Sequence, residues 1–552
     1  MFIETNLTDK RIREYTSKGY WEHMTVGDYL DENIKKYPNK IAIVDPKGRR
    51  VTYKELGRMV NRIALGFLKM GIKKGDIISV QLPNWIEFEY TYFALSKIGA
   101  IMNPLAATYR QNEVYYILKF SESKAVIITD EFRHFNYLKM MEEVKPKLPS
   151  LQHIFVIGES IPSGMLSFSE FTARCWEDEC ELKTLEQNKP NANDILVLMY
   201  TSGTEAEPKG VLHTHNTIIF GEKSFAQALE ISAEDTCFMA SPISHASGFA
   251  HGVNLPMIVG GKTVLLDIWD PEDALKLIEK EKCTFSMGAT PFVRMILDCP
   301  NLHKYDISSM RCYLCGGAPI PREMVTESSK IGLKVLAVYG LTESIPHTVN
   351  RLNDPPEKIY GTDGKPCPGI EVKIVDDNLK ELPIGETGEE ASRGPNICVG
   401  YFKQPEINKK SFDEEGWFYS GDLCRMDKDG YIIVEGRKKD IIIRGGQNIS
   451  VKEIEDLLYN HHKIGNVAIV AMPDRRMGEK ACAFVIPKAG ESITLEEVVS
   501  FLSEKKVAKF KLPERIEVVG EFPTTPSGKI QKYLLRKDLT QKIEMEERTK
   551  NR

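Results

Sequence analysis

The sequence predicts an α/β protein with a large N-terminal body, in which β-sheets are flanked by helices and joined by a small β-subdomain, and a small, mobile α+β C-terminal domain. Three observations predict this fold. Apolar runs typical of buried strands alternate with amphipathic segments up to about residue 340. Short strand-like runs between glycine turns begin near Gly361, and a second mixture of helices and strands follows Arg437. At 552 residues the chain is too long for one core, and we assign residues 1–437 and 438–552 to two domains.

The first hundred residues carry this alternation clearly. Residues 1–24 are polar, and we expect them to lie along the surface. Thr52 and Glu55 have the spacing of a capping box at the start of a helix that runs to about Met70. The other elements expected here are helices over 25–37 and 87–98 and strands over 41–45 and 77–82.

The later elements change in character along the chain. Gly436 and the charged run after it form the best candidate for a linker. Before it we expect strands over 195–200, 314–317, 335–341, 371–376, 385–392, 399–402, 417–422 and 431–436. After it we expect helices over 451–459 and 495–502 and strands over 467–470 and 481–486.

A loop of small and hydroxyl residues follows the apolar run at residues 195–200. It contains Thr201, Ser202, Gly203 and Thr204 and reaches Lys209 before the next apolar pair. Such a loop can turn N–H and O–H donors toward a polyanion, and Lys209 adds a positive charge, so we interpret it as a triphosphate-binding loop. An ordinary Ser/Gly turn is the alternative. A Walker-A loop does not fit, because Lys209 is followed by glycine rather than by Ser or Thr.

Three further segments of the body carry candidate site residues. His245 stands in a small-residue loop, where a structural hydrogen-bonding role is the alternative to a catalytic one. Gly316 and Gly317 end a strand, where glycine permits close approach by a flat ligand or another backbone. The run from Tyr339 to Glu343 ends a strand on a hydroxyl and a carboxylate, which predicts a Mg²⁺ ligand or a helix-starting acid.

Composition narrows the class of protein. A net charge of −5 argues against general nucleic-acid binding. The chain shows no run of 18 apolar residues and no signal-peptide pattern at its start, and its 11 cysteines are scattered, so we expect a cytoplasmic protein without a transmembrane segment. Cys312 and Cys315 have zinc-like spacing but lack a second pair, which favours buried thiols.

Taken together, these segments resemble the adenylate-forming superfamily of acyl-CoA and aryl-CoA synthetases, peptide-synthetase adenylation domains and luciferases. The resemblance covers nearly the whole chain. Four more segments look like bacterial short- and medium-chain fatty acid–CoA ligases, and cyclohexanecarboxylate–CoA ligases share some of them. These segments span residues 82–85, 265–268, 287–292 and 390–396.

The resemblance implies roles for individual residues around ATP. Tyr339 would stack on adenine, Thr342 would touch the α-phosphate and Glu343 would bind Mg²⁺. Asp422 would accept hydrogen bonds from the ribose, joined by Arg437. The β- and γ-phosphates would lie on Thr201, Ser202, Gly203, Thr204 and Lys209, and the adenosine would lie along Gly316, Gly317, Ala318 and Gly340.

The same resemblance implies the remaining site residues and the reaction. Lys529 would reach the carboxylate and the α-phosphate, and Lys439 would be the hinge. Gly445 and Gly446 would line the path of pantetheine, and His245, Phe249 and Gly288 would form the acyl pocket. The implied reaction is an AMP-forming acid–CoA ligation with ATP, Mg²⁺ and coenzyme A, through an acyl-adenylate.

Two features qualify the implied function. Glu205, Ala206 and Glu207 stand where many relatives have a more neutral, glycine-containing turn, and we expect weaker or more Mg²⁺-dependent ATP binding. Ala246 follows His245 where dihydroxybenzoate ligases have Asn, so we expect short- or medium-chain aliphatic or alicyclic acids. An enzyme that loads a separate carrier protein and a non-catalytic nucleotide-binding protein remain alternatives, and a homodimer is a possible assembly.

Overall fold

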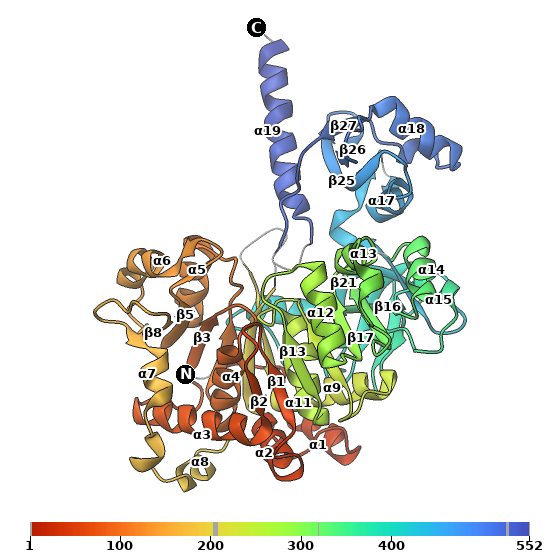
Figure 1. Ribbon diagram of the computed structural model, residues 1–552. Coiled ribbons are helices and arrows are strands. Elements are labelled where there is room, and N and C mark those ends of the chain that lie inside the picture. Colours follow the sequence, from red (N-terminus) through yellow and green to blue (C-terminus); the bar gives the residue numbers. More distant parts are fainter. Residues whose placement is uncertain (1–2, 202–207, 318–319, 446, 526–528, 551–552) are drawn as a thin grey trace. The chain divides into compact units, whose positions relative to one another are not determined.

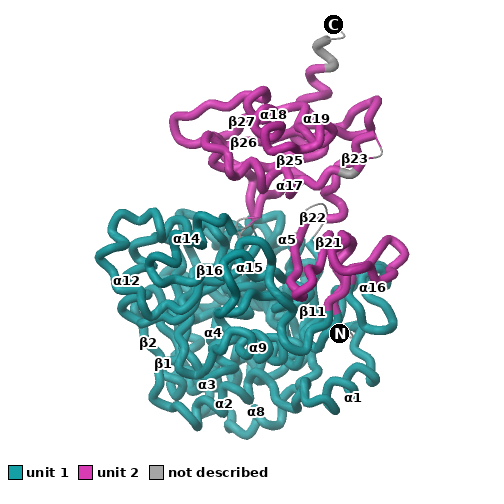
Figure 2. The backbone as a smooth tube through the Cα atoms, turned by 90° about the vertical axis from the view of Figure 1, so that its right-hand side faces the viewer, with its two compact units in different colours: residues 1–201, 208–371, 393–418 teal, residues 202–207, 372–392, 419–552 magenta. Residues whose placement is uncertain are grey.

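The computed structural model describes residues 3–201, 208–317, 320–445, 447–525 and 529–550 (Figure 1). Within these residues the chain forms two compact units (Figure 2). The first contains residues 3–201, 208–371 and 393–418, and the second contains residues 372–392 and 419–550. The boundary predicted after Arg437 therefore lies inside the second unit, and the assignment of 438–552 as a separate domain stays a prediction.

The first unit contains a mixed sheet that, among the described residues, has nine strands. The inner strands, from β16 to β1, are parallel, whereas β17, β18 and β2 run antiparallel to their neighbours. In order across the sheet they are β18 (Lys365–Pro366), β17 (Ser344–Val349), β16 (Lys334–Leu341), β15 (Cys312–Gly316), β14 (Phe285–Gly288), β12 (Thr236–Met239), β13 (Lys262–Leu265), β1 (Ile41–Val44) and β2 (Arg50–Thr52).

A second sheet of the same unit has seven strands in the described part of the chain. It is parallel except for β11, which returns antiparallel to β10. Its order is β11 (Gly210–Thr214), β10 (Ile195–Tyr200), β4 (Ile101–Pro104), β3 (Ile77–Gln81), β5 (Ala125–Thr129), β8 (His153–Ile157) and β9 (Leu166–Ser167). Parallel strands connected through helices are typical of α/β proteins, so the predicted class is confirmed.

Helices connect and cover these strands (Figure 1). Apolar side chains of α5 and α6 form one core cluster with β4, β5, β8 and β10. The helices of the first unit are α1 (Asp9–Ser17), α2 (Val26–Lys36), α3 (Tyr53–Lys69), α4 (Ile86–Ile98), α5 (Gln111–Ser121), α6 (Tyr137–Val144), α7 (Phe168–Ala173), α8 (Lys183–Gln187), α9 (His215–Leu229), α10 (Ala246–Gly248), α11 (Leu255–Val259), α12 (Pro271–Glu281), α13 (Thr290–Leu297), α14 (Arg322–Lys330), α15 (Pro356–Gly361) and α16 (Pro405–Ser411). The predicted capping box is present, with the Thr52 side chain accepting from the Glu55 N–H.

The second unit contains two smaller sheets. One consists of β19 (Glu371–Val375), β20 (Gly388–Arg393), β21 (Phe418–Met426) and β22 (Ile432–Arg437). The other consists of β23 (Ile442–Arg444), β24 (Gln447–Ile449), β25 (Ile464–Asp474), β26 (Gly478–Pro487) and β27 (Arg515–Val518). Helices α17 (Val451–Leu458) and α18 (Leu495–Glu504) share a core with one face of β25, and α19 (Lys532–Lys550) packs on residues of the opposite face.

Residues 3–24 lie mostly at the surface, although Trp21 is buried and its indole N–H donates to the Pro395 carbonyl at 3.0 Å. One local expectation is wrong. Residues 399–402 are not a strand, although they bond to β11. Val399 N–H donates to Leu212, Phe402 N–H donates to Gly210, and Tyr401 forms a single bridge with Val211. This pairing fixes Tyr401 beside the strand that leaves Lys209.

Candidate functional site

The loop between β10 and β11 is closed by two hydrogen bonds between a threonine and a lysine. Thr201 N–H donates to the Lys209 carbonyl at 2.9 Å, and Lys209 N–H donates to Thr201 Oγ1 at 3.4 Å. The Lys209 ammonium lies 5.1 Å from the centre of the Tyr401 ring, within the range of a cation–π contact. Ser202, Gly203, Thr204 and the acidic residues 205–207 lie outside the described residues.

Thr342 and Glu343 form the turn of a tight hairpin and do not start a helix. Leu341 at the end of β16 pairs directly with Ser344 at the start of β17. The Glu343 backbone carbonyl accepts from the Cys398 N–H at 2.8 Å. The side-chain Oε1 of Glu343 accepts from the Tyr401 hydroxyl at 2.7 Å. Glu343 is buried, so the turn presents a carboxylate whose backbone and side chain are both fixed.

His213 on β11 holds the other carbonyl of this turn. Its Nε2 lies 2.7 Å from the Thr342 carbonyl oxygen, and its Nδ1 lies 3.1 Å from Thr217 Oγ1. Because a carbonyl can only accept, Nε2 carries the hydrogen. Burial lowers the pKa of His213 to about 4, so the imidazole is neutral near pH 7.

Tyr401 is therefore in contact with both candidate groups of this region. Its hydroxyl bonds to Glu343, and its ring faces Lys209. Burial, together with the nearby Glu343 charge, raises the pKa of Tyr401, so the hydroxyl stays a donor. Through Tyr401 the structure brings the lysine loop and the Thr342–Glu343 turn together.

Gly316 and Gly317 lie at the carboxyl end of β15, next to the parallel strand β16. Gly316 ends β15 beside Val338 of β16, and a Cβ there would lie 3.1 Å from both the Val338 carbonyl oxygen and its Cγ1. Gly317 has φ +83°, a region that favours glycine. Tyr339 is half-buried with its ring 5.2 Å from that of His347, and the following Gly340 is exposed. Ala318 lies outside the described residues.

Asp422 and Arg437 meet within the second unit. They are direct partners in the antiparallel pair β21–β22, and Arg437 Nε lies 2.7 Å from Asp422 Oδ1. Asp422 is nearly buried, whereas Arg437 is more than one third exposed. The pair that the sequence assigned to ribose recognition is thus a preformed ion pair at the edge of a small sheet.

Lys529 closes a second loop in the same way as Lys209 closes the first. Thr525 N–H donates to the Lys529 carbonyl at 2.8 Å, and Lys529 N–H donates to Thr525 Oγ1 at 3.1 Å. The Lys529 side chain is exposed. Lys439 lies in the 3₁₀ turn Lys438–Asp440 between β22 and β23.

Gly445 has a local structural reason to be glycine. It lies in the turn that joins β23 to β24, where Arg444 pairs with Gln447, and its φ is +56°. A Cβ there would lie 2.5 Å from the Met477 methyl carbon. Gly446 lies outside the described residues, so the role of this glycine pair along a pantetheine path stays a prediction.

The acyl-pocket candidates lie before α10, in the irregular helix that follows it, and at the end of β14. His245 precedes α10, and its Nδ1 lies 3.2 Å from Ser247 Oγ. Phe249 is fully buried and packs edge-on against Tyr92, with ring centres 4.8 Å apart. At Gly288, which ends β14, a Cβ would lie 2.7 Å from the Tyr313 hydroxyl and 2.8 Å from the Phe292 ring. Gly288 is therefore closely surrounded, and a side chain at this position would displace a neighbour.

Phe249–Asn254 is a π-helix, and two of its carbonyls accept hydrogen bonds from side chains. Pro256 has no N–H, and the Gly252 carbonyl four residues earlier accepts instead from Thr263 Oγ1 at 2.8 Å. The Phe249 carbonyl accepts from the Asn254 side chain at 2.9 Å. His251 lies 2.9 Å from Glu222, and both side chains are buried. These contacts fix the backbone that carries Phe249.

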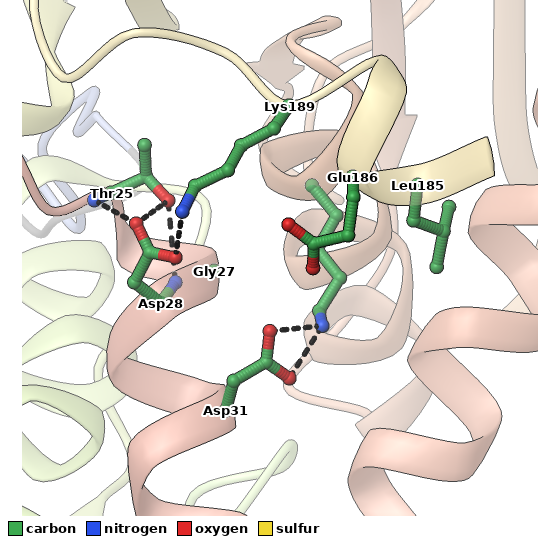
Figure 3. A pocket seen from close by; sticks show the side chains of 8 residues that line it. Thr25, Gly27, Asp28, Asp31, Leu185, Glu186 and Lys189 are labelled. Carbon is green, nitrogen blue, oxygen red and sulfur yellow. Dashed lines mark hydrogen bonds and ion pairs between the residues drawn. The ribbon is translucent and has the colours of Figure 1, made fainter. Parts of the chain in front are cut away.

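Other features of the described residues add no further ligand site. The pocket in Figure 3 lies outside the predicted sites and is closed by ion pairs of Lys189 with Asp28 at 2.5 Å and Lys97 with Asp31 at 2.6 Å. Cys312 and Cys315 are buried free thiols, as predicted. Among the residues that the structure describes, no group of three or more His, Cys, Asp or Glu side chains could hold a metal. In the same residues, no helix has the length and apolarity needed to cross a bilayer.

Comparison with known proteins identifies the family. Residues 30–402 match the family described as AMP-binding enzyme, and residues 453–529 match its C-terminal domain. The chain belongs to the AMP-binding enzyme family. The predicted membership of the adenylate-forming superfamily is thereby confirmed.

Two relatives show the range of this AMP-binding enzyme family. The chain is 43% identical over 545 residues to the medium-chain fatty-acid–CoA ligase of Escherichia coli K12, covering 98% of this chain and 95% of that protein. It is 33% identical to the 2,3-dihydroxybenzoate-AMP ligase of Bacillus subtilis 168, covering 97% of each chain.

Solved structures agree with the fold. ATP-bound MatB from Rhodopseudomonas palustris superposes with a TM-score of 0.83 at 28% identity, covering 94% of this chain and 99% of that one. The anthranilate CoA ligase AuaEII, in complex with anthranoyl-AMP, gives a TM-score of 0.84 at 27% identity, covering 94% and 97%.

The sequence reasoning missed two residues that contact this AMP-binding enzyme's candidate site. From the sequence we assign Tyr401 only to a short strand and give no role to His213, which follows the apolar pair Val211–Leu212. A weak signal existed for His213. A histidine inside a buried strand needs hydrogen-bond partners for its ring nitrogens, and this strand directly follows the Lys209 loop. Tyr401 gave no such signal, because its partner Glu343 is 58 residues earlier in the chain.

Proposed function

We propose that this enzyme is an ATP-dependent carboxylic acid–CoA ligase that acts on short- and medium-chain aliphatic or alicyclic acids through an acyl-adenylate. The observation that carries the reaction type is the meeting of Lys209, Tyr401 and Glu343 within one compact unit. It places a cation, a buried donor and a carboxylate in one contact chain, next to strand ends where α/β proteins bind ligands.

The first half-reaction needs charge neutralisation more than acid–base chemistry. A carboxylate oxygen of the acid attacks the α-phosphorus of ATP, the bond to the β-phosphate oxygen breaks, and pyrophosphate leaves. Lys209 and the N–H and hydroxyl groups of its loop hold the leaving phosphates. The Thr342 hydroxyl contacts the α-phosphate, and Lys529 neutralises charge on the carboxylate and the α-phosphate.

Glu343 fits a Mg²⁺ ligand, because it offers buried carboxylate oxygens whose position is fixed by the hairpin turn and by Tyr401. When bound with ATP, the cation supplies positive charge to the phosphate oxygens. Asp422 and Arg437 form the ion pair that we assign to ribose binding.

In the second half-reaction the thiol of CoA attacks the acyl carbonyl, and AMP leaves. Lys529 is no longer needed at that stage, and pantetheine needs access to the carbonyl. We assign the exchange to rotation at Lys439, in the short turn between two strands of the second unit, which brings the Gly445–Gly446 segment into use.

The class of acid follows from the pocket candidates and the relatives. Ala246 and Phe249 are buried and apolar, and the segment offers no amide after His245 to bind a ring hydroxyl. The identity of 43% to a medium-chain fatty-acid–CoA ligase favours aliphatic acids over the aryl acid of the dihydroxybenzoate ligase.

Acid-dependent ATP–pyrophosphate exchange tests this proposal. The panel runs from acetate to decanoate and includes benzoate, 2,3-dihydroxybenzoate and cyclohexanecarboxylate. We expect exchange to be strongest with aliphatic or alicyclic acids and expect CoA to trigger AMP release with the same acids. Exchange with no acid would refute the catalytic assignment, and a preference for 2,3-dihydroxybenzoate would refute the acid class. Exchange without CoA-dependent AMP release would favour loading of a carrier protein.

A further inference from the structure

We propose that Tyr401 is a positioning residue that sets Lys209 and Glu343 against one metal–nucleotide complex. The inference rests on the proposed function, because it takes Lys209 as a phosphate ligand and Glu343 as a metal ligand. It assigns to one side chain the coupling between the phosphate loop and the metal-binding turn.

The first support is the set of contacts that fixes the position of Tyr401. Only 3% of its surface is exposed. Its N–H donates to Asn408 Oδ1 at 2.7 Å, and the Asn408 amide donates back to the Tyr401 carbonyl at 3.1 Å. Tyr401 also forms a backbone bridge with Val211, two residues after Lys209. The backbone that carries the Tyr401 ring is thus held against the strand that follows Lys209.

The second support is the hydroxyl. A phenol O–H bound to a carboxylate is a charge-assisted hydrogen bond, stronger than a neutral one. At 2.7 Å it restrains the position of Oε1 of the Glu343 carboxylate. A carboxylate has about four acceptor positions on its two oxygens, so one phenol leaves acceptor positions for a cation. A pre-oriented carboxylate loses less conformational freedom when the cation binds.

The third support is the ring face. The Lys209 ammonium lies 5.1 Å from the ring centre, which limits the directions that its long flexible side chain takes. The hydroxyl and the ring belong to one rigid side chain. A displacement of Tyr401 therefore moves the supports of both charged groups together.

These two contacts can be separated by substitution. Tyr401→Phe keeps the ring that faces Lys209 and removes the hydroxyl that holds Glu343. Tyr401→Leu removes both. Tyr29→Phe is the matched control, because Tyr29 is also buried and donates to a glutamate, Glu22 Oε2, at 2.8 Å on helix α2, outside the candidate site.

The test measures Mn²⁺ binding by electron paramagnetic resonance, with and without a non-hydrolysable ATP analogue that carries a methylene group between the α- and β-phosphates. We expect Tyr401→Phe to weaken Mn²⁺ binding to the protein–nucleotide complex about tenfold, as for the loss of one charge-assisted hydrogen bond. We expect its metal-free affinity for the analogue to stay within about twofold of wild type. Tyr401→Leu is expected to weaken metal-free nucleotide binding as well, because Lys209 loses the ring.

The outcomes separate this inference from the proposed function. Wild-type Mn²⁺ affinity in Tyr401→Phe, or an equal loss in Tyr29→Phe, would overturn the positioning role. Either result together with intact acid-dependent pyrophosphate exchange in the wild type would leave the proposed function standing. Equal weakening of metal-free nucleotide binding in both Tyr401 variants would also overturn it, because the ring and the hydroxyl would then not act separately.

Discussion

The stability of the first unit should depend on pH through His213. This histidine is buried and donates to the Thr342 carbonyl, and burial lowers its pKa from 6.5 to about 4. The folded chain therefore keeps His213 neutral, whereas the unfolded chain takes up a proton below pH 6.5. The stabilisation is complete above pH 6.5 and is lost as pH falls toward 4. For these pKa values, the linkage relation gives a loss of about 2 kcal/mol between pH 7 and pH 5.

His213→Gln isolates this contribution. Glutamine can still donate to the Thr342 carbonyl but does not titrate. We expect the variant to lose about 2 kcal/mol less than wild type between pH 7 and pH 5. His215, whose pKa burial also lowers to about 4, stays in both proteins and cancels in the comparison.

Urea unfolding followed by tryptophan fluorescence measures the difference. All 5 tryptophans lie in the first unit, so the signal reports on the unit that contains His213. His303→Gln is the control, because His303 is exposed and its substitution makes the same His-to-Gln change outside the candidate site. Parallel pH dependence in wild type and His213→Gln would show that His213 is not held neutral by burial.

Three further predictions concern the proposed reaction. Lys529→Ala should reduce acyl-adenylate formation at least 100-fold but spare thioester formation from supplied acyl-adenylate, because only the first step needs its charge; rapid-quench assays of each half-reaction check this, and equal loss of both would contradict the assignment. Gly288→Ala should raise KM for decanoate more than for butyrate, because the added Cβ would displace the Tyr313 hydroxyl and the Phe292 ring, 2.7 and 2.8 Å away, and narrow the acyl pocket that we assign to this strand end; equal changes for both acids would place Gly288 outside the acyl pocket. Asp422→Asn should weaken ATP binding about tenfold in calorimetry, because it removes the charge that pairs with Arg437 and would accept from ribose; unchanged affinity would exclude the ribose role.

The sequence predicted best those features that depend on neighbouring residues. The Thr52–Glu55 capping box forms from contacts within a few positions, and the strands before Lys209 and Thr342 are marked by continuous apolar runs; the structure contains all three. The hairpin turn at Thr342–Glu343 was not predicted, because the strand that follows it depends on pairing within the sheet. Local patterns specify where a segment begins, whereas its partner is decided by the tertiary fold.

The contacts that fix the candidate site join distant parts of the sequence. His213 reaches Thr342 across 129 positions, and Tyr401 reaches Glu343 across 58. A single sequence contains no distance information of this kind. The sequence therefore indicated the charged residues that we assign to ATP binding. It did not indicate His213 and Tyr401, the neutral residues that bond to the Thr342–Glu343 turn.

The loops that end at Lys209 and Lys529 share one backbone hydrogen-bond pattern, although they lie in different parts of the sequence. In Lys209 and in Lys529 the backbone carbonyl accepts a hydrogen bond from a threonine N–H. The backbone N–H of each lysine donates to the hydroxyl of the same threonine. Their backbones are therefore bound within the loop, and the ammonium group is the part of each lysine that can meet an anion. Because Lys209 and Lys529 lie in different compact units, a change in the relative position of the units would move one ammonium relative to the other. This relative movement is what a two-step reaction requires if Lys209 holds phosphates throughout while Lys529 acts only in the first step.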